Sequence, residues 1–241
     1  MQNDNPQPTS TSIDISRIAD FADQYDDTYF ANRHGGDPLR QKSFADEARF
    51  IRSHRQAGVL LDVGCGTGEF LAALQWNGPI YGMEIARNAI LEAQKRGICF
   101  DKSLINENEF FDIIIFRGTI QHIPVPFAYL QFAYQALKPG GHVVFLATPN
   151  ANSIYYKIWN TLPALEPEKN FFIPSDIVLI NAMRNIGFNL CEIRYPYWSS
   201  PYASPIRDHW NFVCSLFGRR RKFPFWRNMM DAVFEKQAPD V

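Results

Sequence analysis

The sequence has no apolar run long enough to cross a bilayer, and residues 1–12 lack both the basic start and the apolar stretch of a secretory signal. Cysteine is scarce, with 4 in 241 residues, and no two cysteines have the C-x-x-C spacing. This pattern excludes a disulfide framework and a zinc site of the common spacing. Together these absences predict a protein of the reducing cytoplasm, without a transmembrane segment or a metal.

A strong charge of either sign is also missing. The 24 basic residues (Lys and Arg) nearly balance the 25 acidic residues (Asp and Glu), so the formal net charge is −1. A general nucleic-acid binder needs an excess of basic charge, and we therefore expect no nucleic-acid partner. Hydrophobic residues make up 46% of the chain, which is enough for a sizeable core, and the length suits a single α/β domain.

Three glycines alternate within residues 61–70, which read LDVGCGTGEF. An apolar strand before them and a helix after them predict a loop that lies against a ligand. Gly64 and Gly66 leave no side chain in the way, and the free N–H groups of the following helix point at the ligand. A dinucleotide-binding loop has the spacing G-x-G-x-x-G, whereas here Gly68 comes one residue early.

The form D-x-G-x-G-x-G, which starts at Asp62, resembles motif I of the class I S-adenosylmethionine (SAM)-dependent methyltransferases. Three further motifs that resemble the same family follow in the same order. They are the acidic end of a strand at residues 80–84, a β-branched strand at 111–116 followed by 120–123, and the turn into a strand at 137–145 followed by 148–150. The resemblance covers roughly residues 55–150.

The resemblance and the hydrophobic periodicity agree on an α/β, Rossmann-like fold. We expect a seven-stranded sheet, mostly parallel with the last strand antiparallel, helices on both faces and an aromatic-rich cap. The expected strands are 59–63, 80–83, 98–100, 112–116, 142–147, 188–195 and 230–235. The expected helices are 41–56, 69–76, 86–96, 127–137 and 176–186.

The chain divides by composition into a disordered tail and one domain. The tail is 1–12 and the methyltransferase domain is 13–241. The domain is expected to consist of an N-terminal helical cap at 13–56, a SAM-binding core at 57–150 and a C-terminal part at 151–241, with acceptor-site insertions at 151–174 and 196–228. Long loops of this kind are often lids or binding loops.

The resemblance implies a set of residues that bind SAM. Glu84 would accept hydrogen bonds from both ribose hydroxyls, and Asp62 would hold the loop and the ammonium end of the ligand, with a pure loop brace as the alternative for Asp62. Asp101 would take the adenine amino group, unless it is a solvated turn residue. The rest of the expected cofactor site consists of Gly64, Cys65, Gly66, Gly68, Ile85, Arg117 and Gly118.

Arg117 has three open interpretations: a contact to the carboxylate tail of SAM, a contact to the acceptor, or an ordinary surface arginine. His122 follows the strand at 112–116 and is the candidate general base, while a structural hydrogen bond is the alternative. Tyr25, Tyr29 and His209 are candidate acceptor contacts from the aromatic segments at both ends of the chain.

The basic run at 219–222 is expected either to be a solvated loop or to contact an anion, such as a pyrophosphate or an acidic membrane surface. The aromatic segments around 25–30 and 195–210 either close over the acceptor or simply pack a cap. The sequence leaves both questions open, and it also leaves open whether the protein is a monomer or a homodimer.

These features predict a SAM-dependent methyltransferase that acts on a small molecule, at oxygen, with a sugar, a quinone-like compound or a lipid-linked metabolite as acceptor. The absence of an Asn-Pro-Pro-Tyr type motif argues against methylation of base or glutamine nitrogen. The alternatives are an NAD(P)-dependent oxidoreductase, which the glycine spacing disfavours, and a non-catalytic SAM-binding protein.

Overall fold

The computed structural model describes residues 37–101, 103, 107–165, 168–218 and 222–238. The expected tail at 1–12, the candidate contacts Tyr25 and Tyr29, and positions 219–221 of the basic run lie outside this part of the chain. None of the helices in the described residues has both the length and the apolar character that a membrane span requires.

The described residues form one sheet with the strand order β2-β1-β3-β4-β6-β5, in which β6 runs antiparallel to both of its neighbours. Its strands are β1 (Leu60–Val63), β2 (Ile80–Met83), β3 (Phe111–Arg117), β4 (Leu137–Pro149), β5 (Phe188–Arg194) and β6 (Met229–Lys236). The helices are α3 (Pro38–His54), α4 (Glu69–Leu74), α5 (Arg87–Lys95), α6 (Pro126–Ala136), α7 (Ile154–Trp159), α8 (Asp176–Ile186), α9 (Pro205–Phe217) and the 3₁₀ helix η3 (Ile120–His122).

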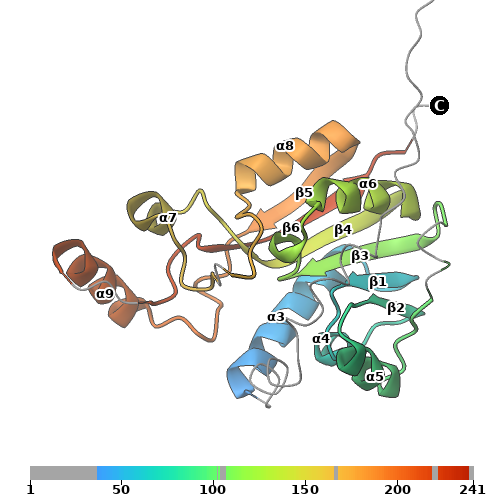
Figure 1. The fold of residues 1–241 in the computed structure, drawn as a ribbon, viewed down its shortest axis with the longest axis horizontal. Helices are drawn as coiled ribbons and strands as arrows, with labels where there is room; N and C mark the ends of the chain where they lie inside the picture. Colours follow the sequence, from blue (N-terminus) through green and yellow to red (C-terminus); the bar gives the residue numbers. More distant parts are fainter. Residues whose placement is uncertain (1–36, 102, 104–106, 166–167, 219–221, 239–241) are drawn as a thin grey trace, which may run out of the picture.

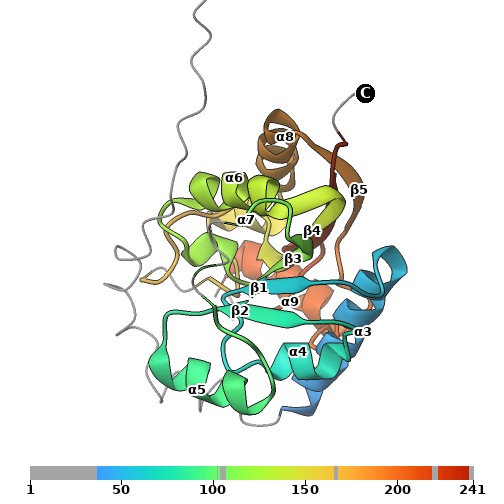
Figure 2. The ribbon, with the colours of Figure 1, turned by 90° about the vertical axis from the view of Figure 1, so that its right-hand side faces the viewer.

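Helices cover both faces of the sheet, as the sequence predicted. Figure 1 shows α6 and α8 on one face and α3, α4 and α5 on the other, and Figure 2 shows the same layers from the side. The apolar run at residues 111–116 is buried along its whole length because β3 lies between β1 and β4. Two separate apolar clusters fill the spaces above and below the sheet.

The prediction of seven strands was wrong, because the described residues form six. In the segment 98–100, only Cys99 makes a bridge, to Tyr81 of β2. The chain then turns away, since the Asp101 carboxylate accepts hydrogen bonds from the backbone N–H (2.9 Å) and the hydroxyl (2.7 Å) of Ser103. Such a local side-chain turn competes with the extension of a strand.

Two helix predictions also needed correction. The helix predicted at 41–56 begins three residues earlier, at Pro38, and the carboxylate of Asp37 caps it by accepting a hydrogen bond from the Leu39 N–H at 2.9 Å. The insertion 196–228, for which the sequence predicted a lid or binding loop, contains α9. The two insertions share an apolar cluster that includes Tyr155, Leu162, Leu165, Phe223 and Phe225. That these aromatic residues close over a ligand stays a prediction.

Asp176, the first residue of α8, joins this helix to three other segments of the chain. Its buried carboxylate accepts hydrogen bonds from the Tyr195 hydroxyl at 2.6 Å, the Arg227 guanidinium at 2.7 Å and the Asn152 amide at 2.8 Å. Burial alone would raise the pKa of this carboxyl, but these hydrogen bonds lower it to about 2. Asp176 therefore stabilises the fold in its ionised form.

We expect Asp176→Asn to lower the free energy of unfolding by about 2 kcal/mol at pH 7, because the ionised carboxylate is favoured in the folded state. In the wild type this contribution is present above about pH 4 and is lost as the pH falls through about 2. Urea unfolding at several pH values measures it. The exposed Glu168→Gln is the control, and equal stability of the two variants at pH 7 would contradict the assignment.

Candidate functional site

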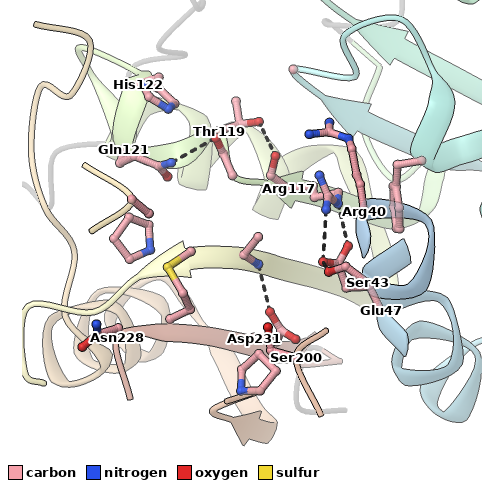
Figure 3. Close-up of a pocket in the computed structure, with 18 of the residues that line it drawn as sticks. Arg40, Ser43, Glu47, Arg117, Thr119, Gln121, His122, Ser200, Asn228 and Asp231 are labelled. Carbon is pink, nitrogen blue, oxygen red and sulfur yellow. Dashed lines mark hydrogen bonds and ion pairs between the residues drawn. The ribbon is translucent and has the colours of Figure 1, made fainter. Parts of the chain in front are cut away.

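A cavity of about 700 Å³ opens at the carboxyl ends of β1, β2 and β3, where ligands bind in open α/β sheets. Figure 3 shows Thr119, Gln121 and His122 along one side, Asn228 and Asp231 across from them, and residues of α3 at one end. The predicted site residues that line this cavity are Asp62, Gly64, Cys65, Gly66, Glu84, Ile85, Arg117, Gly118 and His122.

The glycine loop lies against its neighbours so closely that side chains would not fit. Gly64 has a φ of +76°, and a Cβ there would lie 2.5 Å from Cγ2 of Thr119. Gly68 does not line the cavity; it starts α4 with a φ of +79°, and a Cβ there would lie 2.2 Å from Cδ1 of Ile98. Gly68 is therefore required for packing of the loop against Ile98, which the sequence reading did not foresee.

Glu84 follows β2 and holds the loop through backbone hydrogen bonds. Its Oε2 accepts from the Gly66 N–H at 2.9 Å, and its Oε1 accepts from the N–H groups of Ile85 at 2.7 Å and Ala86 at 3.0 Å. Burial raises the pKa of Glu84, and the three N–H donors oppose that shift. An ionised carboxylate offers about four acceptor positions, so Glu84 retains capacity for a ligand hydroxyl.

Asp62 is the last polar residue of β1 and is almost completely buried. Its Oδ1 has no hydrogen-bond partner among the residues that the structure describes. Burial raises the pKa of this carboxyl to about 7, and the nearby Arg117 opposes the shift. A buried acceptor without a partner is costly, and a cationic ligand group placed beside Asp62 would relieve that cost.

Arg117 is a brace whose side chain is 16% exposed, and it is not a surface residue. Its Nε lies 2.5 Å from Oε2 of Glu47, its Nη2 lies 3.1 Å from Oε1 of the same side chain, and its guanidinium lies over the rings of Phe44 and Phe70. Burial lowers the pKa of Arg117, but the Glu47 carboxylate opposes that shift. The net pKa lies above its ordinary value, so the guanidinium stays charged. Arg117 thereby joins the end of β3 to α3.

The sequence reading missed Glu47 and Asp231, two buried acids that line the cavity. Asp231 accepts a hydrogen bond from the Ala147 N–H at 2.9 Å and from Nε of Arg194 at 3.0 Å, and burial raises its pKa to about 6. A signal was present for each. Glu47 falls on the buried stripe of its helix, and Asp231 interrupts an apolar strand.

The opposite end of the cavity carries amides instead of acids. Asn228 is 4% exposed, and neither its Oδ1 nor its Nδ2 has a hydrogen-bond partner in the described part of the chain. Gln121 donates to the Gly118 carbonyl at 3.0 Å, whereas its Oε1 has no such partner. Within 118–129, 162–164, 196–202 and 222–229, no lining residue is acidic, and Lys222 and Arg227 are basic.

Of three further predicted residues, one lines the cavity and two do not. The ring of His122 lines the cavity, and its Nδ1 lies 2.7 Å from the carbonyl oxygen of Lys169. Asp101 is exposed and does not line the cavity. His209 lies on α9, outside the cavity lining, with its Nδ1 2.7 Å from the Pro205 carbonyl oxygen. The structure therefore brings together the expected residues of the glycine loop, β2 and β3, but not Asp101 or His209.

Known proteins share this sequence pattern and this fold. A family model described as a methyltransferase domain matches residues 39–193. The ubiquinone biosynthesis O-methyltransferase of Cronobacter sakazakii is 27% identical over 163 residues, which cover 61% of this chain and 65% of that enzyme. The human "Probable tRNA methyltransferase 9B" is 28% identical over 58% of this chain, and the match spans only 29% of the human protein.

A solved structure of similar fold is the methyltransferase in complex with the Trm112 methyltransferase activator of Haloferax volcanii. It has a TM-score of 0.65 and 14% sequence identity, and the match covers 91% of this chain and 99% of that one. This likeness supports the fold alone. The family model spans more than half of the chain and includes the glycine loop, Glu84 and β3, and it shows that the protein belongs to the class I SAM-dependent methyltransferases.

Proposed function

We propose that this enzyme transfers the methyl group of SAM to an oxygen atom of a small-molecule acceptor that binds at the amide-lined end of the cavity. The observation that carries the proposal is the division of the cavity. One end has buried acids around the glycine loop. The other end has the Asn228 amide and the Gln121 Oε1, which have no partner in the described residues, together with basic residues and no acid among its described lining residues. The two ends suit two different ligands.

The acidic end suits the cofactor. The Oδ1 of Asp62, which has no partner in the described residues, fits the ammonium group of the methionine tail, and Glu84 fits the ribose hydroxyls. Gly64 and Gly66 let the backbone approach the cofactor closely. Asp101 as the contact of the adenine amino group stays a proposal. SAM supplies an electrophilic methyl group, so the protein needs to hold and orient the acceptor and to take up its proton.

The other end suits a neutral or anionic acceptor. A cationic amine would meet Lys222 and Arg227, and the nearby Asp176 carboxylate is already paired with Arg227 and does not line the cavity. The amide of Asn228 can both donate to and accept from an acceptor with hydroxyl or carbonyl groups. The name of the Cronobacter relative describes methylation at oxygen, which agrees with this chemistry. A sugar, a quinone-like compound and a lipid-linked metabolite all remain candidate acceptors.

His122 is the proposed general base. Its Nδ1 lies 2.7 Å from the Lys169 carbonyl oxygen, which can only accept a hydrogen bond. This contact favours the tautomer that carries the proton on Nδ1, so that Nε2 carries the lone pair. A hydroxyl acceptor at this end of the cavity would pass its proton to Nε2 as the oxygen attacks the methyl group.

The cofactor assignment predicts a specific stabilisation by S-adenosylhomocysteine, the product of SAM. At about 100 times its dissociation constant, this ligand should add about 2.7 kcal/mol to the free energy of unfolding, measured as a thermal shift. NAD should give no shift. Glu84→Ala should remove the effect, and Glu92→Ala, on α5 and outside the cavity lining, should retain it. A shift with NAD, or none with S-adenosylhomocysteine, would overturn the assignment.

The raised pKa of Asp62 predicts that cofactor binding depends on pH. The carboxyl ionises as the pH rises through about 7, so S-adenosylhomocysteine should bind most tightly above that pH and weaken by up to about tenfold per unit below it. Calorimetric titrations between pH 5.5 and 8.5 (roughly the range that brackets this pKa) measure the effect. Asp62→Asn should give a flat profile. Asp231→Asn, which removes a different buried acid, should keep the slope.

Oxygen methylation can be tested with a panel of acceptors and radiolabelled SAM. The panel pairs dihydroxybenzoates, quinols and hexoses with the amines histamine and glycine. Methylation should occur among the hydroxyl compounds, and His122→Ala should lower kcat by about 10²–10⁴-fold without weakening S-adenosylhomocysteine binding. Turnover of the amines alone, or full kcat in His122→Ala, would contradict the proposal.

A further inference from the structure

Helix α9 buries polar residues and exposes apolar ones, which is the reverse of an ordinary surface helix. Its buried residues are polar: Asp208, Asn211 and Ser215, at spacings that place them on one face. Asp208 is fully buried, and its Oδ2 accepts hydrogen bonds from the Ser204 N–H at 2.7 Å and the Tyr197 hydroxyl at 3.3 Å. The polar side chains on this face of α9 therefore have interaction partners inside the protein.

Four apolar residues of α9 face outward along one stripe of the helix. Ile206, Trp210, Val213 and Phe217 are 90%, 67%, 47% and 87% exposed, and they recur at steps of four, three and four residues along one stripe. A continuous apolar stripe on a surface helix is unusual. It marks a site that binds a membrane or another molecule.

The apolar cluster that the two insertions share fixes this orientation of α9. The ring of Phe212 stacks on Phe225 with centroids 4.3 Å apart and packs edge-on against Trp159 of α7 at 5.2 Å. Rotation of α9 to bury its apolar stripe would break these contacts and would expose Asp208. Figure 1 shows α7 and α9 together at one end of the molecule, away from the helices that cover the sheet.

The charge around the stripe is basic. The acidic residue of α9, Asp208, is buried and pairs with Arg207 at 3.3 Å, whereas the Arg207 side chain is 63% exposed and carries its charge to the surface. In the sequence, α9 is followed by Gly218 and then by three arginines and Lys222. An apolar stripe that contains tryptophan and phenylalanine, flanked by basic residues, has the character of a helix that lies in the surface of an anionic membrane.

We propose that α9 docks in the plane of an anionic lipid membrane, with its apolar stripe among the acyl chains and with Arg207 and Lys222 at the headgroups. A second copy of this chain is a poorer occupant of the same stripe, because α9 has no exposed acidic residue to pair with Arg207 of the other copy. The proposal is independent of the chemistry of methyl transfer.

Docking would also orient the cavity. The segments that enter and leave α9, at 196–202 and 222–225, line the acceptor end. With α9 on the membrane, these segments lie at the bilayer surface, and an acceptor held in the membrane could reach the cavity without leaving the lipid. The inference thus favours a lipid-linked or membrane-partitioned acceptor among the candidates.

The test is flotation of the full chain with two kinds of vesicles, one of phosphatidylcholine and one of phosphatidylcholine with phosphatidylglycerol. The protein should bind the anionic vesicles, and high salt should weaken binding. Ile206→Asp combined with Phe217→Asp should lower the bound fraction at least about tenfold, since both side chains lie in the stripe. Leu91→Asp combined with Ile177→Asp, which alters exposed apolar residues of α5 and α8, should leave binding unchanged.

Each variant is also measured by thermal shift with S-adenosylhomocysteine, so that loss of folding or of cofactor binding is distinguished from loss of docking. Absence of binding to anionic vesicles by the wild type, or retained binding by the α9 double variant, would overturn the proposal. A dimer in sedimentation analysis that the α9 double variant dissociates would assign the stripe to a second copy and would overturn it as well.

Discussion

The largely buried ion pair between Arg117 and Glu47 is the interaction on which the site depends. It joins the end of β3 to α3, and its guanidinium is the positive charge that opposes burial of Asp62. Without Arg117, the cavity floor would hold Glu47, Asp62 and Asp231 close together, and like charges in a buried site cannot all ionise. One guanidinium therefore sets both the geometry of the cavity and the charge of the end that suits the cofactor.

The part of the site formed by local sequence was predictable. The glycine loop and Glu84 follow directly from strands, and the carboxyl ends of parallel strands meet at one edge, so their proximity could be expected from the pattern. The six strands of the sheet were also predictable from apolar runs. The segment at 98–100 was not, because the turn made by Asp101 and Ser103 ends the pairing after one bridge.

The rest of the site depends on contacts between distant segments. The cavity brings together Glu47, Asn228 and Asp231 because α3 and β6 approach the end of β3. No local sequence pattern predicts that approach. Arg117 had several readings for the same reason, since its partner lies 70 residues away in the sequence. The periodicity of α9 is present in the sequence, but an apolar stripe is normally expected to face inward, and only the tertiary contacts of Phe212 reveal the opposite orientation.

The strand order has a consequence for how the protein folds. Among the described strands, β6 comes last in the chain, yet it lies between β4 and β5. Until β6 is synthesised, β4 and β5 each have an edge without a partner, and such edges invite pairing with other chains. Asp231 lies on this strand and Asn228 immediately before it, so the final step that closes the sheet also completes the cavity. A nascent chain that stalls before this point is both incomplete in function and exposed to aggregation.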